Sequence, residues 1–254
     1  VHNFGHPAFW LALDPTNANR MYASVVHSTA GGIFVSSNLQ NGASSTWTKL
    51  SNPPRTEGHP ATVVVLNDGK VICTYSGHRA PGFTASSGVF MYDPSTATWA
   101  DLSDPGMRYW TKDIVVDPAD ATQNTWLVCV FSGWGGAPNG LGGLYRTTDR
   151  GAHWTKINAL DRVTSIAFSP GNSNDAFLTT ETDGLWHSGN VHAASPTFTR
   201  VSNYPFRQPE RVFFNPYNAS EIWISSFGHG LMIGTLTASG IIAPSHAVIT
   251  IMGQ

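Results

Sequence analysis

Short apolar segments recur along the chain in a fixed order, with a period of about fifty residues. Each repeat begins with an apolar strand that ends at a turn such as Asp-Pro or Asn-Pro, continues with a second apolar strand, and follows with a third strand led by glycine. Four of the repeats then show a fourth strand led by an aromatic residue. Four strands per unit at this period are typical of a β-propeller blade.

The order occurs five times. The predicted first strands are 9–15, 61–68, 113–118, 163–170 and 211–216, the second strands are 20–26, 70–76, 126–132, 175–181 and 221–227, and the third strands are 31–37, 88–93, 142–148, 184–189 and 230–236. We therefore predict an all-β chain that forms a single β-propeller domain of about five four-stranded blades. The repeats span approximately 1–58, 59–106, 107–160, 161–204 and 205–254.

The last segment, 237–254, fits two interpretations. It is either the fourth strand of the last repeat or the beginning of another domain. Five blades can close a ring, but related propellers commonly have more, so the chain either closes alone or forms part of a larger propeller.

The clearest turn signal lies in residues 144–157, LYRTTDRGAHWTKI. Thr147, Asp149, Gly151 and Trp154 fit the Asp-box pattern Ser/Thr-x-Asp-x-Gly-x-x-Trp. Asp149 can accept hydrogen bonds from N–H groups of the turn, Gly151 can take a positive φ, and Trp154 can pack beneath the hairpin. We expect these four residues to have a structural role.

Composition narrows the function classes. Only 12% of the residues are charged, the net charge is −2, and no helical periodicity is evident. A basic face for nucleic acid or for an anionic membrane is not predicted. No run of eighteen apolar residues suggests a membrane span. The chain begins with Val1, which favours a mature secreted, extracellular protein or an excised piece.

The two cysteines occupy matching places in neighbouring repeats. Cys73 and Cys129 both lie in second strands, three residues before Ser76 and Ser132. Equivalent positions of adjacent blades should lie farther apart than the ~7 Å limit for a disulfide. We predict two free, buried thiols.

Three histidines occupy ends of strands. His6 and His59 stand in the similar phrases GHPAFWLAL and GHPATVVVL. Either both histidines open a first strand and face one cavity, or Gly-His-Pro is only a loop sequence that related repeats share. His78 follows the second strand of the same repeat as His59. Two imidazoles at one channel mouth can move protons or bind a ligand, but no third metal ligand is evident, so we predict no metal and no cofactor.

Aromatic residues accumulate in long loops between strands. Segments 79–87 and 133–141 are rich in small residues and carry Phe83 and Trp134, respectively. Tyr109 and Trp110 precede a first strand near the same mouth. Since aromatic rings stack on the apolar faces of sugars, these four residues are candidate ligand contacts. The alternative for Trp134 is that its ring packs back onto its own blade.

Three carboxylates are expected at strand ends that face the channel. Glu181 ends a second strand, whereas Glu210 and Asp113 open first strands. Hydrolysis of a glycosidic bond uses one acid and one carboxylate, so Glu181 with Glu210 or Asp113 is a candidate catalytic pair. The alternative is structural: Asp113 lies beside Lys112, and Glu210 lies between Arg207 and Arg211, which suggests ion pairs between blades. Arg211 is also a candidate ligand contact.

The repeats resemble the Asp-box propellers of xyloglucanase-type glycoside hydrolases and of sortilin-like domains. The phrases LALDPTNANRMYASV, VVDPADATQNTWLV, GGLYRTTDRGAHWTKI and FNPYNASEIWISSFGHG carry the resemblance, which extends over nearly the whole chain. It implies action on polysaccharide, and it places Glu181 at about the position of the xyloglucanase family's catalytic Asp. The family also uses a second propeller around its cleft, which implies a second propeller or self-association here.

A second resemblance concerns the phrase GHPATVVVLNDGKVICTYSGH, which is similar to the histidine arrangement of propeller polysaccharide lyases. It implies proton abstraction by His59 and His78, with Arg108 and Tyr109 nearby. Three functions therefore remain open for the chain: a glycoside hydrolase, a lyase, or a binding module without turnover that recognises a glycan or a protein.

Overall fold

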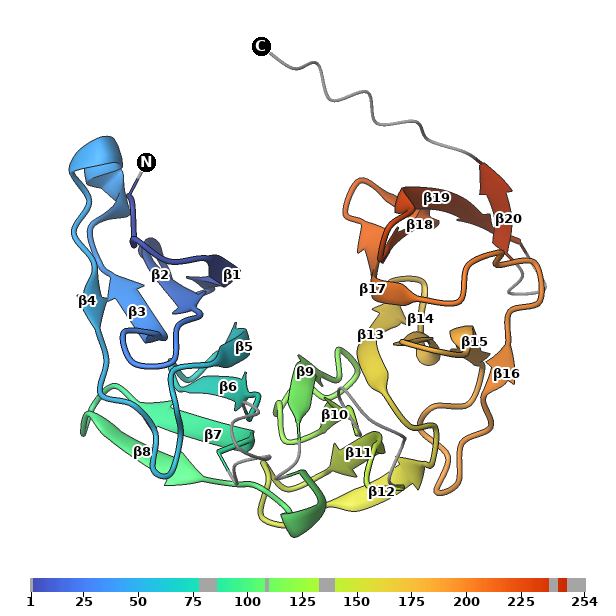
Figure 1. The fold of residues 1–254 in the computed structure, drawn as a ribbon, viewed down its shortest axis with the longest axis horizontal. Helices are drawn as coiled ribbons and strands as arrows, with labels where there is room; N and C mark the ends of the chain where they lie inside the picture. Colours follow the sequence, from blue (N-terminus) through green and yellow to red (C-terminus); the bar gives the residue numbers. More distant parts are fainter. Residues whose placement is uncertain (1, 78–85, 108–109, 133–139, 238–241, 246–254) are drawn as a thin grey trace.

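The computed structural model describes residues 2–77, 86–107, 110–132, 140–237 and 242–245 of the chain. These residues form five four-stranded antiparallel sheets, and in every sheet the strands are neighbours in the order of the sequence. The sheets are arranged around a common centre as the blades of a β-propeller (Figure 1). The predicted all-β fold of five four-stranded blades is confirmed.

Each blade lies within one predicted repeat, and each first strand faces the centre (Figure 1). Blades 1 to 3 consist of β1 (Ala8–Asp14), β2 (Asn17–Val25), β3 (Gly32–Ser36) and β4 (Thr48–Lys49); β5 (Pro60–Val65), β6 (Val71–Tyr75), β7 (Gly88–Asp93) and β8 (Thr98–Asp101); and β9 (Thr111–Val116), β10 (Trp126–Val130), β11 (Gly143–Thr147) and β12 (Thr155–Asn158). Blades 4 and 5 consist of β13 (Val163–Ser169), β14 (Asn172–Thr180), β15 (Gly184–Ser188) and β16 (Thr199–Arg200); and β17 (Pro209–Asn215), β18 (Asn218–Ser226), β19 (Gly230–Leu236) and β20 (Ile242–Ser245).

The last strand, β20, shows that the fifth blade has a fourth strand. β20 lies within the segment 237–254 and pairs with β19, so part of that segment is the fourth strand of blade 5. Besides strands, the described residues contain two short 3-10 helices, Leu39–Ser44 and Pro105–Met107.

Alternation along the strands divides the apolar side chains between the two faces of each blade. In β9, Ile114 packs in the core that blade 3 shares with blade 2, whereas Val115 packs against the core shared with blade 4. Four such cores join blades 1 and 2, 2 and 3, 3 and 4, and 4 and 5. The fully buried thiols of Cys73 and Cys129 belong to these cores and form no disulfide, as predicted, and burial raises the pKa of both.

One hydrogen bond between the first and second strands recurs in every blade and marks equivalent positions in the repeats. The residue after the second strand donates its N–H to the carbonyl of a residue just before the first strand. The pairs are Val26 to Pro7, Ser76 to His59, Phe131 to Trp110, Glu181 to Arg162 and Phe227 to Gln208, at 2.8–3.0 Å. His59 is therefore equivalent to Pro7 and not to His6, so the expectation that His6 and His59 match was wrong. The similar phrases GHPA are offset by one residue in the fold.

Blade 1 presents an uncovered apolar face. Four residues after the recurring carbonyl, blades 2 to 5 carry Val63, Ile114, Ile166 and Val212, and each is at most 2% exposed because it packs on the preceding blade. Leu11 holds this position in blade 1 and is 55% exposed, and Leu13 is 57% exposed. Blades 1 and 5 lie at the two ends of the arc of blades (Figure 1).

Polar contacts and one glycine with a positive φ shape the hairpin between β11 and β12. Asp149 accepts hydrogen bonds from Thr147 Oγ1 at 2.8 Å and from the N–H of His153 at 2.9 Å. Gly151 has a φ of 87°, in the left-handed region that glycine adopts without strain. Trp154 Nε1 donates to the carbonyl of Leu102 at 2.7 Å, so the hairpin of blade 3 is tied to blade 2.

In the parts of the chain that the structure describes, no helix is long and apolar enough to cross a membrane.

Candidate functional site

The candidate site is the channel mouth, which we define as the end of the central channel where the first strands begin and the second strands end. A cavity of about 480 Å³ opens there between blades 1, 2, 3 and 5. It is lined by Phe9, Val26, His59, Pro60, Ala61, Ser76, Gly77, Trp110, Lys112 and Glu210. His59 and Trp110 carry the recurring hydrogen bond, so the regular register of the blades brings these dissimilar residues to one opening.

A second cavity adjoins the first and contains two of the predicted catalytic carboxylates. It has a volume of about 400 Å³ and shares Trp110, Lys112 and Glu210 with its neighbour. Its complete lining is Trp110, Lys112, Phe131, Glu181, Gln208, Glu210 and Phe227. The fold therefore brings Glu181 of blade 4 and Glu210 of blade 5 to one cavity.

Lys112 is the central cation of the mouth. Its Nζ donates to Glu210 Oε2 at 3.3 Å and lies 5.2 Å from the ring centre of Trp110 and 5.3 Å from that of Phe131. The rings of Trp110 and Phe131 meet edge to face at 4.7 Å. These contacts fix the orientation of the Trp110 indole at the cavity wall.

Glu181 also has a cationic partner. Arg162 Nη1 donates to Glu181 Oε2 at 2.5 Å, and the Arg162 guanidinium lies 5.5 Å from the ring centre of Phe131. The sequence shows no basic residue beside Glu181, and Arg162 was missed because it lies 19 residues away. The available signal was its place immediately before a first strand, the same place that Trp110 holds in blade 3.

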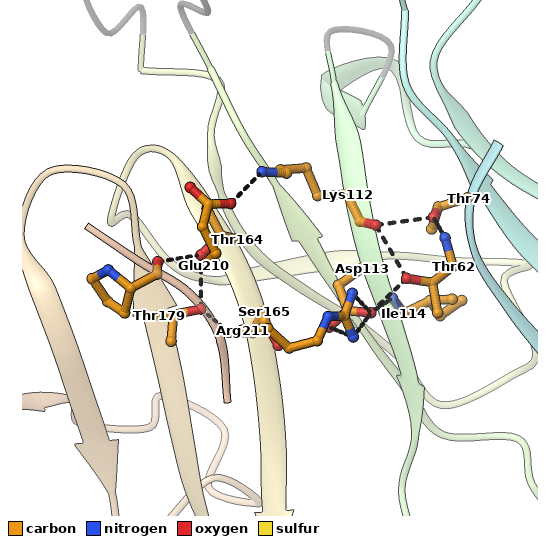
Figure 2. Close-up of polar contacts among 11 residues, drawn as sticks. Thr62, Thr74, Lys112, Asp113, Ile114, Thr164, Ser165, Thr179, Glu210 and Arg211 are labelled. Atoms are coloured by element: carbon orange, nitrogen blue, oxygen red, sulfur yellow. Dashed lines mark hydrogen bonds and ion pairs between the residues drawn. The ribbon is translucent and has the colours of Figure 1, made fainter. Parts of the chain in front are cut away.

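A polar network below the mouth holds the inner strands together (Figure 2). Asp113 is 1% exposed, accepts hydrogen bonds from Thr62 Oγ1 at 2.7 Å and from the N–H of Ile114 at 3.1 Å, and pairs with Arg211 at 3.5 Å. The Arg211 guanidinium lies 4.1 Å from the ring centre of Trp10. Blades 1, 2, 3 and 5 thus meet at Asp113 and Arg211.

The start of β17, where Glu210 lies, is fixed by blade 4. Thr164 Oγ1 donates to the carbonyl of Pro209 at 3.2 Å and forms a 2.7 Å hydrogen bond with Thr179 Oγ1 (Figure 2). All three residues are buried. The backbone that presents Glu210 to the cavity is therefore anchored on the preceding blade.

The predicted ion pairs formed with different partners from those that the sequence suggested. Asp113 pairs with Arg211 and not with its neighbour Lys112, whereas Glu210 pairs with Lys112 and not with Arg207 or Arg211. Side chains of adjacent residues point to opposite sides of a strand, so the partner comes from across the channel.

The other predicted ligand contacts divide into three groups. Trp110 and His59 line the mouth, and Arg211 lines a deeper cavity together with Trp10 and Glu210. His6 does not line the mouth cavities and stacks on His27, with 4.0 Å between the ring centres. Phe83, His78, Tyr109, Trp134 and the nearby Arg108 lie outside the described residues.

Known proteins resemble the chain mainly in fold, and no family model matches it. Over 146 residues, which are 51% of this chain and 16% of the relative, it is 28% identical to the xyloglucanase Xgh74A of Acetivibrio thermocellus. An ancestral GH74 enzyme superposes with a TM-score of 0.67 at 16% identity, covering 94% of this chain and 31% of that one. PorZ, an essential surface component of the type-IX secretion system of Porphyromonas gingivalis, gives a TM-score of 0.65 at 14% identity, with 94% and 34% covered.

The chain thus spans about a sixth of the length of the xyloglucanase and about a third of each of the two structures. At these identities the two structures establish the fold alone. The fold is that of the propellers found in glycoside hydrolases and in a bacterial surface protein.

Proposed function

We propose that the chain is a glycoside hydrolase-like propeller that binds plant or microbial polysaccharide at the channel mouth. The observation that carries the proposal is the pair of adjoining cavities in which the Trp110 indole lies beside Lys112 and Glu210. An indole stacks on the apolar face of a sugar, and charged groups beside it bind the hydroxyl groups at the sugar's edge. The similarity to a xyloglucanase supports the same ligand class.

A panel of soluble polysaccharides tests this proposal. Binding to each is measured by affinity electrophoresis, while reducing ends and unsaturated products are assayed in the same samples. We expect retardation by at least one glycan. Failure to bind any glycan in the panel would contradict the proposal and would favour a protein partner.

Hydrolysis is the second candidate function, because Glu181 and Glu210 line the same cavity. A glycosidase needs one carboxylic acid to protonate the leaving oxygen and one carboxylate to act on water or on the sugar carbon. In the absence of a ligand each of these carboxylates contacts a cation, Arg162 or Lys112. A bound glycan would have to share or replace one of these contacts before the carboxylate could act.

The test for hydrolysis uses the variants Glu181→Gln and Glu210→Gln. If both residues act in catalysis, each variant loses the release of reducing ends by at least about a hundredfold, the scale of acid–base catalysis, while glycan binding remains. Retained turnover in both variants would reject this pair. Unsaturated products would instead implicate His59, which lines the same mouth.

We also propose that the protein acts outside the cell and that another propeller or a second copy covers the face of Leu11 and Leu13. The surface location of PorZ supports the first part, and the exposure of two leucines at positions buried in the other blades supports the second. Analytical ultracentrifugation tests the case of a second copy. Self-association that disappears in a Leu11→Asp, Leu13→Asp variant is the expected result, and a monomer at high concentration would contradict that case.

A further inference from the structure

A third cavity extends the channel mouth outward between blades 4 and 5. It has a volume of about 310 Å³ and is lined by Glu181, Thr182, Arg207, Gln208 and His229. It shares Glu181 and Gln208 with the cavity that contains the two carboxylates. The three adjoining cavities therefore extend from His59 at one side of the mouth to His229 at the other, an arrangement that suits a chain-like ligand.

Positive charge is in excess in the third cavity, at the outer end of the series, because of Arg207. Lys112, Arg162 and Arg211 each pair with a carboxylate. Arg207 has no such partner among the described residues; its Nε donates to the backbone carbonyl of Thr182 at 3.3 Å. Glu181 also lines this cavity, but its carboxylate pairs with Arg162, so Arg207 adds a cation there that no carboxylate of the described residues pairs with.

The groups around this cation are held in place. The hydrogen bond from Nε to Thr182 restrains the Arg207 guanidinium and leaves its two terminal nitrogens for a ligand. His229 stacks on Phe206, with 4.3 Å between ring centres and 27° between planes. Both Arg207 and His229 are exposed, so a ligand can reach them.

We propose that the outer cavity binds the carboxylate of an acidic sugar residue, a hexuronate, within the polysaccharide chain that occupies the mouth. The planar fork of a guanidinium matches a carboxylate with two parallel hydrogen bonds. A neutral sugar would leave the charge of Arg207 unmatched. This inference rests on the proposed function and adds the charge class of the ligand.

The experiment uses pairs of saccharides in which each carboxylate is replaced by a neutral group. Homogalacturonan oligomers are compared with their methyl esters, and glucuronoxylan oligomers with their carboxyl-reduced forms, by isothermal titration calorimetry at ~0.15 M ionic strength, which screens nonspecific attraction. We expect the acidic form of at least one pair to bind about five- to tenfold more tightly. This effect lies between those of an exposed ion pair and of a buried hydrogen bond to a charged group, because the cavity is open to solvent.

The variants assign the effect to its residue. Arg207→Gln should remove the preference for the acidic form while the weaker binding of the neutral form remains. Arg200→Gln, an exposed arginine in β16 that does not line these cavities, is the matched control and should keep the preference.

Three results would overturn the inference. Equal affinity for acidic and neutral forms would reject the hexuronate but leave the polysaccharide site intact. A preference that survives in Arg207→Gln would reject the assignment to Arg207. Failure of acidic and neutral saccharides alike to bind would reject the proposed function, and the inference with it.

Discussion

Two ion pairs cross the channel between β9 and β17 on successive residues, but they lie in different surroundings. The Asp113 side chain in the Asp113–Arg211 pair is 1% exposed, whereas in the Lys112–Glu210 pair the side chains are 18% and 36% exposed. The order of charge is also reversed from one residue to the next. The same two strands therefore carry one ion pair with a buried carboxylate below the mouth and one ion pair that solvent reaches at the mouth.

Removing the Asp113–Arg211 ion pair should destabilise the protein more than any other change considered below. Asp113→Ala removes the nearer of two acceptors for Thr62 Oγ1 and leaves Arg211 without its carboxylate. We expect unfolding free energy to fall by about 2 to 4 kcal/mol, below the cost for a fully buried pair because Arg211 is partly exposed.

Urea denaturation measures this loss, and Glu210→Ala is the matched control on the neighbouring residue. The control should lower the free energy of unfolding by less than about 1 kcal/mol, as expected for a pair in contact with solvent. Equal losses in the two variants would show that the two pairs do not differ in role.

A smaller effect, on glycan affinity, should distinguish a tryptophan at the mouth from one on the blade surface. Trp110→Ala removes the indole from the cavity wall and should weaken glycan binding roughly three- to tenfold, the value of one aromatic contact. Trp99→Ala is the control, since Trp99 packs on Tyr92 and donates to the carbonyl of Ser51 away from these cavities. Calorimetry with the glycan that binds wild type measures both variants. The same loss in each would contradict a site at the mouth.

The smallest expected effect is on the pH dependence of stability, and it comes from the exposed carboxylate of Asp149 in the hairpin between β11 and β12. The pKa of Asp149 is lowered to about 2 from 3.8, chiefly by the backbone N–H of His153. A group with a lowered folded-state pKa contributes its stability above the unfolded-state value and loses it as the pH falls through the folded-state value.

Wild type should therefore lose thermal stability more steeply than Asp149→Asn between about pH 4 and pH 2, the interval set by these two pKa values. Thermal melts of both proteins across this interval measure the difference in slope. Parallel pH profiles would show that Asp149 does not stabilise the hairpin through its charge.

Much of the fold could be predicted because its signals are local. Alternating apolar residues, turns such as Asp-Pro and glycine-led strands recur in every repeat, and the predicted strands overlap those observed. The exception was the match of His6 with His59, where similar phrases concealed an offset of one residue. Hydrogen-bond register, which is a property of the sheet, decides such equivalence.

The site was predictable only in part, because its partners meet across the channel. Lys112 and Glu210 are 98 residues apart, and local charge neighbours suggested other pairs. In the sequence, Phe131 and Phe227 look like ordinary residues at the ends of second strands. Both line the cavity that contains Glu181 and Glu210. The arrangement of the blades around a common centre creates these contacts, and no single repeat contains that information.

Hydrogen–deuterium exchange with and without a bound glycan is the most direct test of a carbohydrate site at the channel mouth. We predict slower exchange on binding in peptides that cover residues 110–113, 181–182 and 207–211, with no change in the hairpin 147–154. Protection confined to that hairpin or to other outer strands, with none at the mouth, would contradict a carbohydrate site at the channel mouth.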